Sequence, residues 1–450
     1  MHTRSVESGG STSSYRSSLR PAMSGIFTAP FLAVLLDMGP QARSPRRWTL
    51  EYVIYVSVLM VLDGSEHLKD RFAHARQDVV ALFPGRKRPG QTYQGYVKAC
   101  RQLHRRRQQA IHRHLRERHR ESAGPFWRRD GWVAFAADGT RVELPRTAAN
   151  EKAFGCAGRD KSGPQLQLTS LYHMGTGLPW AWQIGAGTES EQVHLRHLMR
   201  WLPADSLLVA EAGFASFDLL RSLRERHVHF LVRMGSNRTL LTGLEDGRVQ
   251  IRGERVWLWP TQKQTTYPPL ALRLLRFEQA NHAPMYLVTS VQDEEALTAR
   301  QVGQFYRRRW GQEVFHRSFQ QTLAQHKMRS GSPAEAKREL DWALLGYLVL
   351  GLWSVAALIE TGHDPLTWSV AASLRVVRAA LRQGGGLGRG VWATFLRKAV
   401  KDRYVRTGSK SARNWPRKKQ DHSPGVPKLR AATEKEKHGV KRTYEKTAAA

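Results

Sequence analysis

The chain has 450 residues, in which 71 Lys and Arg face 38 Asp and Glu, so its formal net charge is +33. Such an excess argues against a free-standing enzyme of small neutral metabolites, because self-repulsion opposes the compact state. It indicates a polyanionic partner such as nucleic acid or an anionic membrane surface. Hydrophobic residues make up 41% of the chain, which excludes complete disorder, and the two cysteines, Cys100 and Cys156, favour a cytoplasmic location over a disulfide-rich secreted one.

The N-terminal part is expected to be helical and basic. Residues 1–25 are rich in serine and lack an apolar run, which predicts a disordered leading segment. Residues 26–124 follow as a helical region that ends in a dense basic run, 101–120. Because nearly all of its charge has one sign, this run favours a helix that follows DNA phosphates over an ordinary solvated face. The candidate DNA-binding residues in the run are Arg105, Arg106 and Arg107.

Residues 125–235 alternate between strand and helix signals and predict the first half of an α/β core with a mixed sheet. One apolar strand is expected to end at Asp138, and a second, continuously apolar strand at Glu211. Ligands of α/β folds bind at the carboxyl ends of strands, so both carboxylates are candidate site residues. The alternatives are an ordinary Asp-Gly turn at Asp138 and a helix cap at Glu211.

The second half of the chain contains an insertion, more core and a tail. Residues 236–283 lack a helical period and carry Asp-Gly and Arg-Gly turns, which predicts a β-rich insertion. Residues 284–382 return to core patterns, and their apolar segment 342–360 has acidic flanks that favour a buried core helix over a membrane span. The basic tail, 383–450, has too few apolar residues for a core and is expected to be disordered.

A long amphipathic helix before the apolar segment carries a third carboxylate. Tyr306, Arg309 and Glu313 are spaced i, i+3 and i+7 and therefore share one helix face, which Gln320 extends by seven residues. A solvated face with Arg–Glu pairing is the alternative interpretation. The aromatic and arginine neighbours favour a functional face.

Together the three acids indicate a metal site. Asp138, Glu211 and Glu313 can converge to hold two divalent cations, Mg²⁺ or Mn²⁺, which prefer carboxylate oxygens and lie ~3.5–4 Å apart in two-metal sites. Metal-assisted phosphodiester chemistry needs no serine or cysteine nucleophile. The glycine clusters of the sequence lack the Lys-Ser/Thr pattern of a phosphate-binding loop.

The order of these motifs resembles the DDE transposases of insertion-sequence family four, over about residues 80–360. The motif AADGT contains Asp138, AGF directly follows Glu211, and Y-x2-R-x3-E runs from Tyr306 to Glu313. The long β-rich gap between the second and third acids is also typical of that family. Each motif is weak alone, whereas the three in order are more specific.

The resemblance implies a DNA transposase that cleaves insertion-sequence ends and transfers the strands, using two Mg²⁺ (or Mn²⁺) ions. The implied fold is α/β: a ribonuclease-H-like mixed sheet with flanking helices, a β-rich insertion and a helical N-terminal region. By the same resemblance, Asp138, Glu211 and Glu313 are the catalytic metal ligands, and Tyr306 and Arg309 contact phosphates of the terminal DNA. It further implies double-stranded DNA as partner, a dimer on DNA and a location at the nucleoid, without a membrane part.

Two positions depart from the family pattern. The second acid is ordinarily Asp, whereas position 211 is Glu, and its extra methylene displaces the carboxylate. A displacement of ~1 Å can cost ~100-fold in rate. The family signature ends in Lys, whereas this chain has Gln320, which can bond a phosphate oxygen but adds no charge. The alternative hypothesis is therefore a catalytically impaired, decayed transposase that only binds DNA.

Overall fold

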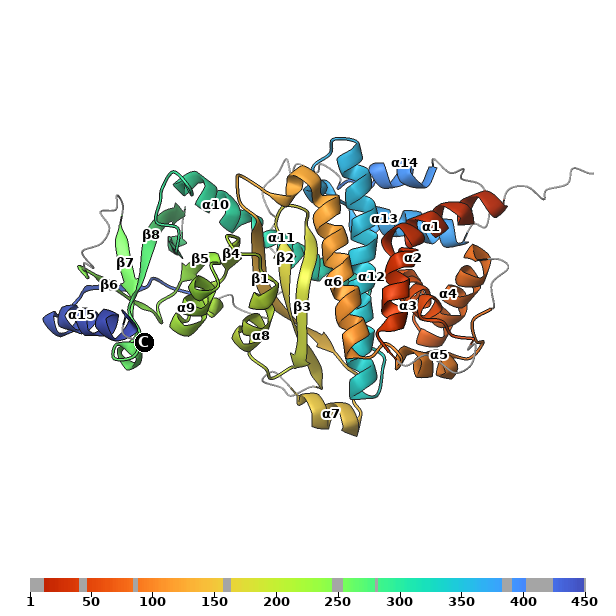
Figure 1. Cartoon of the computed structure of the whole chain (residues 1–450), viewed down its shortest axis with the longest axis horizontal. Helices are drawn as coiled ribbons and strands as arrows, with labels where there is room; N and C mark the ends of the chain where they lie inside the picture. The colour runs from red at the N-terminus through yellow and green to blue at the C-terminus, as the bar shows by residue number, and fades with distance from the viewer. Residues whose placement is uncertain are drawn as a thin grey trace, which may run out of the picture.

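The N-terminal helices, the central sheet and the β-rich insertion follow one another along the long axis of the molecule (Figure 1). The computed structural model describes residues 12–39, 47–83, 88–156, 163–244, 254–279, 282–382, 391–401 and 424–448.

The described strands form one ten-stranded mixed sheet in the order β10-β6-β7-β8-β9-β5-β4-β1-β2-β3. Its core consists of three antiparallel strands, β1, β2 and β3, followed on the other side of β1 by the parallel strands β4 and β5. This arrangement confirms the predicted α/β, ribonuclease-H-like mixed sheet. The core strands are β1 Ala134–Glu143, β2 Gln165–His173, β3 Leu178–Ala186, β4 Leu207–Ala210 and β5 His229–Met234.

The predicted β-rich insertion continues this sheet. β9, most of which falls in the predicted second half of the core (284–382), pairs antiparallel with β5. β8, β7 and β6 of the predicted insertion follow it outward as antiparallel neighbours. A second apolar cluster, which includes Trp257, Leu272 and Val288, extends from these strands to the core strands β1, β4 and β5. The strands are β6 Thr239–Thr242, β7 Arg255–Leu258, β8 Leu270–Gln279 and β9 His282–Thr289.

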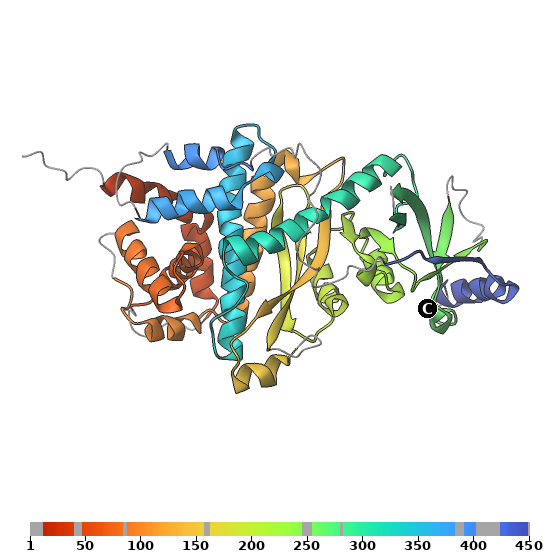
Figure 2. The ribbon, with the colours of Figure 1, turned by 180° about the vertical axis from the view of Figure 1, so that it is seen from behind.

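Helices cover both faces of the core sheet. α8 and α9 lie in front of the sheet in Figure 1. α10 and α11 cross its opposite face, which is turned toward the viewer in Figure 2. The helices of this part are α7 Ala148–Phe154, α8 Glu191–Leu198, α9 Phe217–Glu225, α10 Ala299–Arg308 and α11 Trp310–Arg317.

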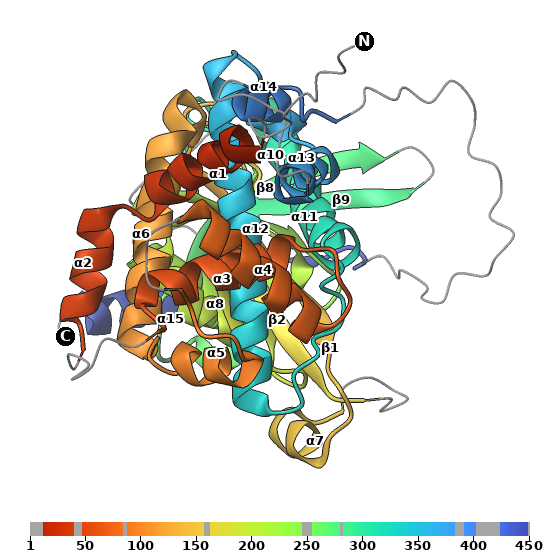
Figure 3. The same ribbon diagram turned by 90° about the vertical axis from the view of Figure 1, so that its right-hand side faces the viewer.

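The predicted helical N-terminal region forms a bundle at one end, which faces the viewer in Figure 3. It packs on α12, Pro333–Glu360, the longest helix of the described chain. The bundle consists of α1 Thr12–Ile26, α2 Ala29–Asp37, α3 Leu50–Leu62, α4 Leu68–Leu82, α5 Tyr93–Cys100 and α6 Arg105–Ala123, and α13 Val370–Arg382 lies against it.

α12 is a core helix in the described structure. By length and composition it could cross a membrane, but 89% of its most apolar window is buried inside the protein. Tyr347, Leu348 and Leu350 are among its buried side chains and belong to the main apolar cluster. Such burial is that of a helix surrounded by its own fold, as the acidic flanks predict.

Gly346 sets the distance between α12 and α3. A Cβ at this position would lie 2.7 Å from Cβ and Cγ1 of Val61. We therefore expect Gly346→Ala to lower the free energy of unfolding by about 1–3 kcal/mol, because the close-packed helices must separate. Chemical denaturation measures the difference. Gly25→Ala is the matched control, since its Cβ meets nothing within 4 Å, and an equal loss there would contradict the packing argument.

The predictions of disorder at the two ends are wrong for the residues that the structure describes. α1 is helical from Thr12, and its Leu19 and Met23 are buried in the bundle, so the helical region begins earlier than predicted. In the tail, α14 (Val391–Arg397), β10 (Lys428–Ala431) and α15 (Glu434–Ala448) are ordered. The remaining parts of these predictions, on 1–11, 383–390, 402–423 and 449–450, lie outside the described residues.

The tail is ordered by an edge of the sheet rather than by a core of its own. β10 pairs in parallel with β6 along Lys428 to Ala431, and backbone pairing at a sheet edge needs few apolar side chains. Glu436 at the start of α15 accepts hydrogen bonds from Arg430 and from Thr433, and Arg430 lowers the pKa of Glu436 to about 2. In Figure 1, α15 lies beside the outer strands of the insertion.

Candidate active site

Asp138 lies at the point where β1 continues beyond its parallel neighbour. β4 pairs with β1 only as far as Ala137, opposite Ala210, whereas β2 pairs with β1 through Glu143. The prediction that the strand ends at Asp138 is therefore wrong, because the antiparallel partner keeps the Asp-Gly pair extended. The Asp138 carboxylate still lies at the end of a parallel strand, because Asp138 is the first β1 residue past the end of β4.

Glu211 directly follows β4, at the strand end where it is predicted, and begins a short 3-10 turn, Ala212–Phe214. Its Oε1 accepts a hydrogen bond from the Tyr306 hydroxyl at 2.8 Å and lies 2.7 Å from Arg309 Nη2. The Glu211 carboxylate is thus directed toward the helix that carries the third acid.

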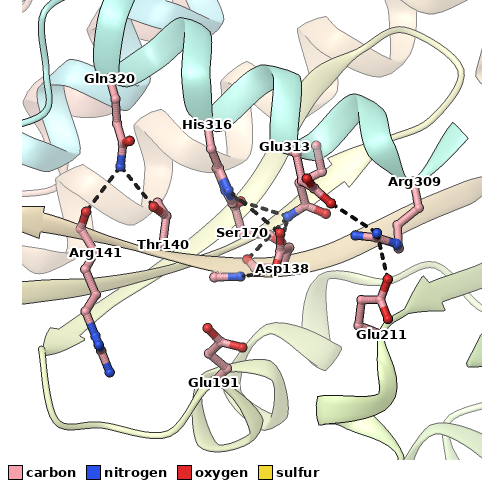
Figure 4. A network of polar contacts seen from close by, with 12 residues as sticks. Asp138, Thr140, Arg141, Ser170, Glu191, Glu211, Arg309, Glu313, His316 and Gln320 are labelled. Carbon is pink, nitrogen blue, oxygen red and sulfur yellow. Dashed lines mark hydrogen bonds and ion pairs between the residues drawn. The ribbon is translucent and has the colours of Figure 1, made fainter. Parts of the chain in front are cut away.

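The predicted long helix is observed as α10 and α11, which meet at Arg309 and are followed by a π-turn, Ser318–Thr322. Arg309 Nη2 also lies 3.1 Å from Glu313 Oε1. One buried guanidinium, 7% exposed, therefore bridges the second and third acids (Figure 4). Burial lowers the pKa of Arg309, but Glu211, Tyr306 and Glu313 raise it more, so that it stays above its usual value.

Asp138 faces α11 from the sheet. Its Oδ1 accepts from the Gly139 backbone N–H at 2.9 Å, and His316 Nδ1 lies 4.0 Å from its Oδ2. Gln312 fixes the strand beneath, because its Nε2 donates to the carbonyl oxygens of Ser170 at 2.8 Å and Asp138 at 3.3 Å. Figure 4 shows Asp138, Ser170 and His316 close to Glu313.

The charge around Asp138 is not balanced. Burial raises the pKa of Asp138 to about 6, and the nearby carboxylates Glu191 and Glu313 add to this, while Arg309 and the Gly139 hydrogen bond only partly offset it. His316 supplies no cation at neutral pH, because burial lowers its pKa to about 4. The Tyr306 hydroxyl stays protonated, since burial and Glu211 raise its pKa.

Glu191 is a fourth acid that the sequence argument missed. It is the first residue of α8, and it lies so near Gly139 that a Cβ on the glycine would collide with its Oε1. Gln167 Nε2 donates to the same oxygen at 3.3 Å. In the sequence, Ser190 and Glu191 show only the pattern of a helix N-cap, so no local signal places Glu191 beside Asp138.

The other predicted DNA-binding residues lie against β1 or on α6. Gln320 is held on β1, where its Nε2 donates to Thr140 Oγ1 at 2.9 Å and to the Arg141 carbonyl at 3.2 Å. Arg105 and Arg106 are exposed on α6 and lie away from the acids.

Arg107 corrects the prediction for the basic run. It is buried, and its guanidinium donates to the carbonyl oxygens of Leu35 at 2.9 Å, Leu36 at 3.2 Å and Gln102 at 3.0 Å. It therefore holds the end of α2 against α6 and is not placed to contact DNA, because its donors are used inside the protein.

The donor set suits a hard divalent cation in part. Asp138, Glu211 and Glu313 offer the carboxylate oxygens that Mg²⁺ and Mn²⁺ prefer, and the raised pKa of Asp138 indicates that a nearby cation would be stabilising. Within the described ranges, no three His, Cys, Asp or Glu side chains are grouped so that they could hold a metal ion. Arg309 instead pairs with both Glu211 and Glu313. A two-ion site therefore requires Arg309 to release Glu211.

Part of the chain is similar to known proteins. Residues 132–349 match the family model described as "Transposase DDE domain". The chain is similar to the transposase InsG for insertion sequence element IS4 of Escherichia coli (strain K12), with 25% identity over 332 residues that cover 70% of this chain and 71% of the relative.

Two solved structures are also similar. One is a cryo-EM structure of the piggyBac transposase synaptic complex with hairpin DNA (11% identity, TM-score 0.42, 84% of this chain and 80% of that chain). The other is a Mos1 transposase paired-end complex (12% identity, TM-score 0.17, 43% of this chain and 60% of that chain). At TM-scores below 0.5, neither likeness establishes a shared detailed structure.

Proposed function

Because residues 132–349 form a transposase DDE domain distantly homologous to an IS4 transposase, we propose that this chain catalyses metal-dependent cleavage and strand transfer at insertion-sequence ends. The observation that supports it most directly is the position of Asp138, a partly buried carboxylate near Glu313 and next to the strand end that carries Glu211. Such a group of acids in a chain of net charge +33 suits a site where phosphates and divalent cations meet.

The three acids would hold two Mg²⁺ or Mn²⁺ ions, which when bound supply Lewis-acid activation of water and of the phosphodiester. Arg309 and Tyr306 would contact phosphate oxygens of the DNA end once Glu211 leaves them. Gln312 and Ser170 keep β1 in register, so that Asp138 stays aimed at α11. Double-stranded DNA at the nucleoid, bound by a dimer, is the proposed partner.

A second candidate is a transposase-derived DNA-binding protein without catalysis. One specific observation favours it: the Glu211 carboxylate contacts both Tyr306 and Arg309, and Figure 4 shows it directed toward Arg309. Such a protein keeps the fold and the basic surfaces, but its three acids do not come together to bind metal.

The two candidates are separated by cleavage of a plasmid that carries the element's own ends, with Mg²⁺ or Mn²⁺. We expect the native chain to cut the plasmid. We expect Glu211→Asp to cut at a rate within about 100-fold of the native rate, because its shorter side chain no longer reaches Arg309 but places the carboxylate ~1 Å from its native position. Glu225→Asp, which shortens an exposed glutamate of α9 by the same methylene, is the control and should change nothing. Cutting by Glu211→Asp alone would show that the native chain is impaired.

A further inference from the structure

A basic and aromatic pocket lies on the side of the molecule opposite α10 and α11. It has a volume of about 320 Å³ and is bounded by α6, β3, the 3-10 turn Met199–Trp201 and the start of α12. α6 and β3 face the viewer in Figure 1, whereas α10 and α11 do so in Figure 2, so this α6–β3 pocket is separate from the acids. The lining includes four cationic and two aromatic side chains, Arg105, Arg116, Arg200, Lys337, Trp182 and Trp201.

The lining carries more positive charge than the protein neutralises. Asp341, an acid of the lining, accepts a hydrogen bond from Trp182 Nε1 at 2.8 Å and lies 3.1 Å from His112 Nε2, so it is already engaged. Arg338, a further lining cation, is paired with Glu335. Among the described residues, Arg105, Arg116 and Arg200 of the lining make no salt bridge with an acid, whereas Lys337 interacts electrostatically with Glu189.

Arg116 is the central residue of this pocket. It is 6% exposed, its guanidinium carbon lies 3.8 Å from the centre of the Trp201 ring, and its Nη2 has no hydrogen-bond partner among the described residues. Burial and Arg113 lower the pKa of Arg116 to about 10, so it remains charged at neutral pH. A buried cation with an unused N–H is unfavourable unless an anion accepts from it.

We propose that the α6–β3 pocket binds a phosphate group of a DNA backbone. Phosphate fits because an arginine fork matches its oxygens and several cations surround one multiply charged group. Trp182 and Trp201 form an apolar wall of the pocket, and Arg116 and Arg200 both lie over the Trp201 ring. That the phosphate belongs to DNA rests on the proposed function, whereas the pocket's affinity for phosphate does not. We expect DNA bound in this pocket to lie along the edge strand β3. This DNA segment is separate from the segment that is bound at the three acids.

The first experiment measures the affinity for phosphate itself. Thermal unfolding is followed in metal-free buffer with sodium phosphate or pyrophosphate and compared with sodium chloride at equal ionic strength. We expect the melting temperature of the native chain to rise with phosphate, because a ligand that binds only the folded state stabilises it. Arg116→Met should fold without loss of stability and show no rise. Arg196→Gln, an exposed arginine four residues before Arg200 and outside the lining, should respond like the native chain.

The second experiment identifies the source of the phosphate. Binding of duplex DNA is measured by fluorescence anisotropy in EDTA over a range of salt concentrations, which keeps it independent of cleavage. Arg116→Met and Arg200→Gln should each weaken binding several-fold and reduce the slope of log affinity against log salt by about 0.9, the value for one lost phosphate contact. Arg196→Gln should leave both quantities unchanged.

Three other results overturn the proposal. A phosphate-dependent rise in melting temperature with unchanged DNA binding would assign the pocket to a free anion instead of DNA. Equal losses in Arg196→Gln would show general surface attraction, and no effect in either experiment would leave Arg116 a structural residue. If DNA binding depends on the pocket but the chain does not cleave, only the proposed catalysis fails.

Discussion

Replacement of Asp138 by Asn is expected to reduce DNA cleavage by at least about 10³-fold while making the metal-free protein more stable at pH 7. The first effect follows from loss of a carboxylate at the proposed catalytic centre, where several kcal/mol of transition-state stabilisation correspond to this factor. The second follows from the raised pKa of Asp138, because the folded protein holds this carboxylate ionised at a cost.

The dependence of stability on pH has a definite sign. The pKa of Asp138 rises from 3.8 to about 6 on folding, so its protonated form is favoured in the folded state. Below pH 3.8 the group is neutral in both states and costs nothing. Stability is lost as the pH rises through the window from 3.8 to about 6, by about 3 kcal/mol, because one pKa unit corresponds to ~1.4 kcal/mol.

Urea denaturation of both proteins in EDTA at pH 4 and pH 7 measures this effect. Asn is nearly isosteric, and its carbonyl oxygen can still accept from the Gly139 N–H, so we expect equal stabilities at pH 4 and a more stable variant at pH 7. Asp130→Asn, which alters an acid paired with Arg308 away from the site, should leave cleavage intact. If the free energy of unfolding of the variant, relative to that of the native chain, were lower at pH 7 than at pH 4, this would contradict the cost of holding Asp138 ionised.

The order of the three acids was predictable because each lies in a local pattern. Glu211 ends a continuously apolar strand, and Glu313 shares a helix face with Tyr306 and Arg309, and both patterns are readable without knowledge of distant partners. The strand end assigned to Asp138 failed for a non-local reason. Its strand is continued by pairing with Ser170 and the rest of β2, which overrides the turn preference of Asp-Gly.

Other features depend on contacts between distant segments and could not be predicted. Arg107 looks like its exposed neighbours, and only the carbonyl groups at the end of α2 turn it into a buried structural residue. Glu191 carries no sign in the sequence that α8 begins beside Gly139. β10 is ordered by pairing with β6, so the composition of the tail was a poor guide to its structure.

Replacement of Arg309 by Gln is expected to have the second large effect, because this residue joins two acids. Its Nη2 lies within 2.7 Å of Glu211 and 3.1 Å of Glu313, and it also lowers the pKa of Asp138. Removing the cation leaves the carboxylates facing one another with less compensation. We expect the metal-free protein to lose about 2–4 kcal/mol of stability at pH 7, since breaking a buried ion pair is costly even where its acids are partly exposed. Cleavage should fall by about 100-fold or more.

The same substitution tests whether Arg309 competes with metal for Glu211. If it does, the variant frees Glu211, and Mn²⁺ should raise its melting temperature more than that of the native chain, although cleavage is lost. Arg308→Gln is the matched control, because the adjacent arginine pairs with Asp130 at 2.7 Å on a partly exposed surface and should cost less than about 1 kcal/mol. Equal stabilisation of all three proteins by Mn²⁺ would show that Glu211 is not withheld by Arg309. The second candidate function would then lose the observation that favours it, because Glu211 would be as available to metal in the native chain as in the variant.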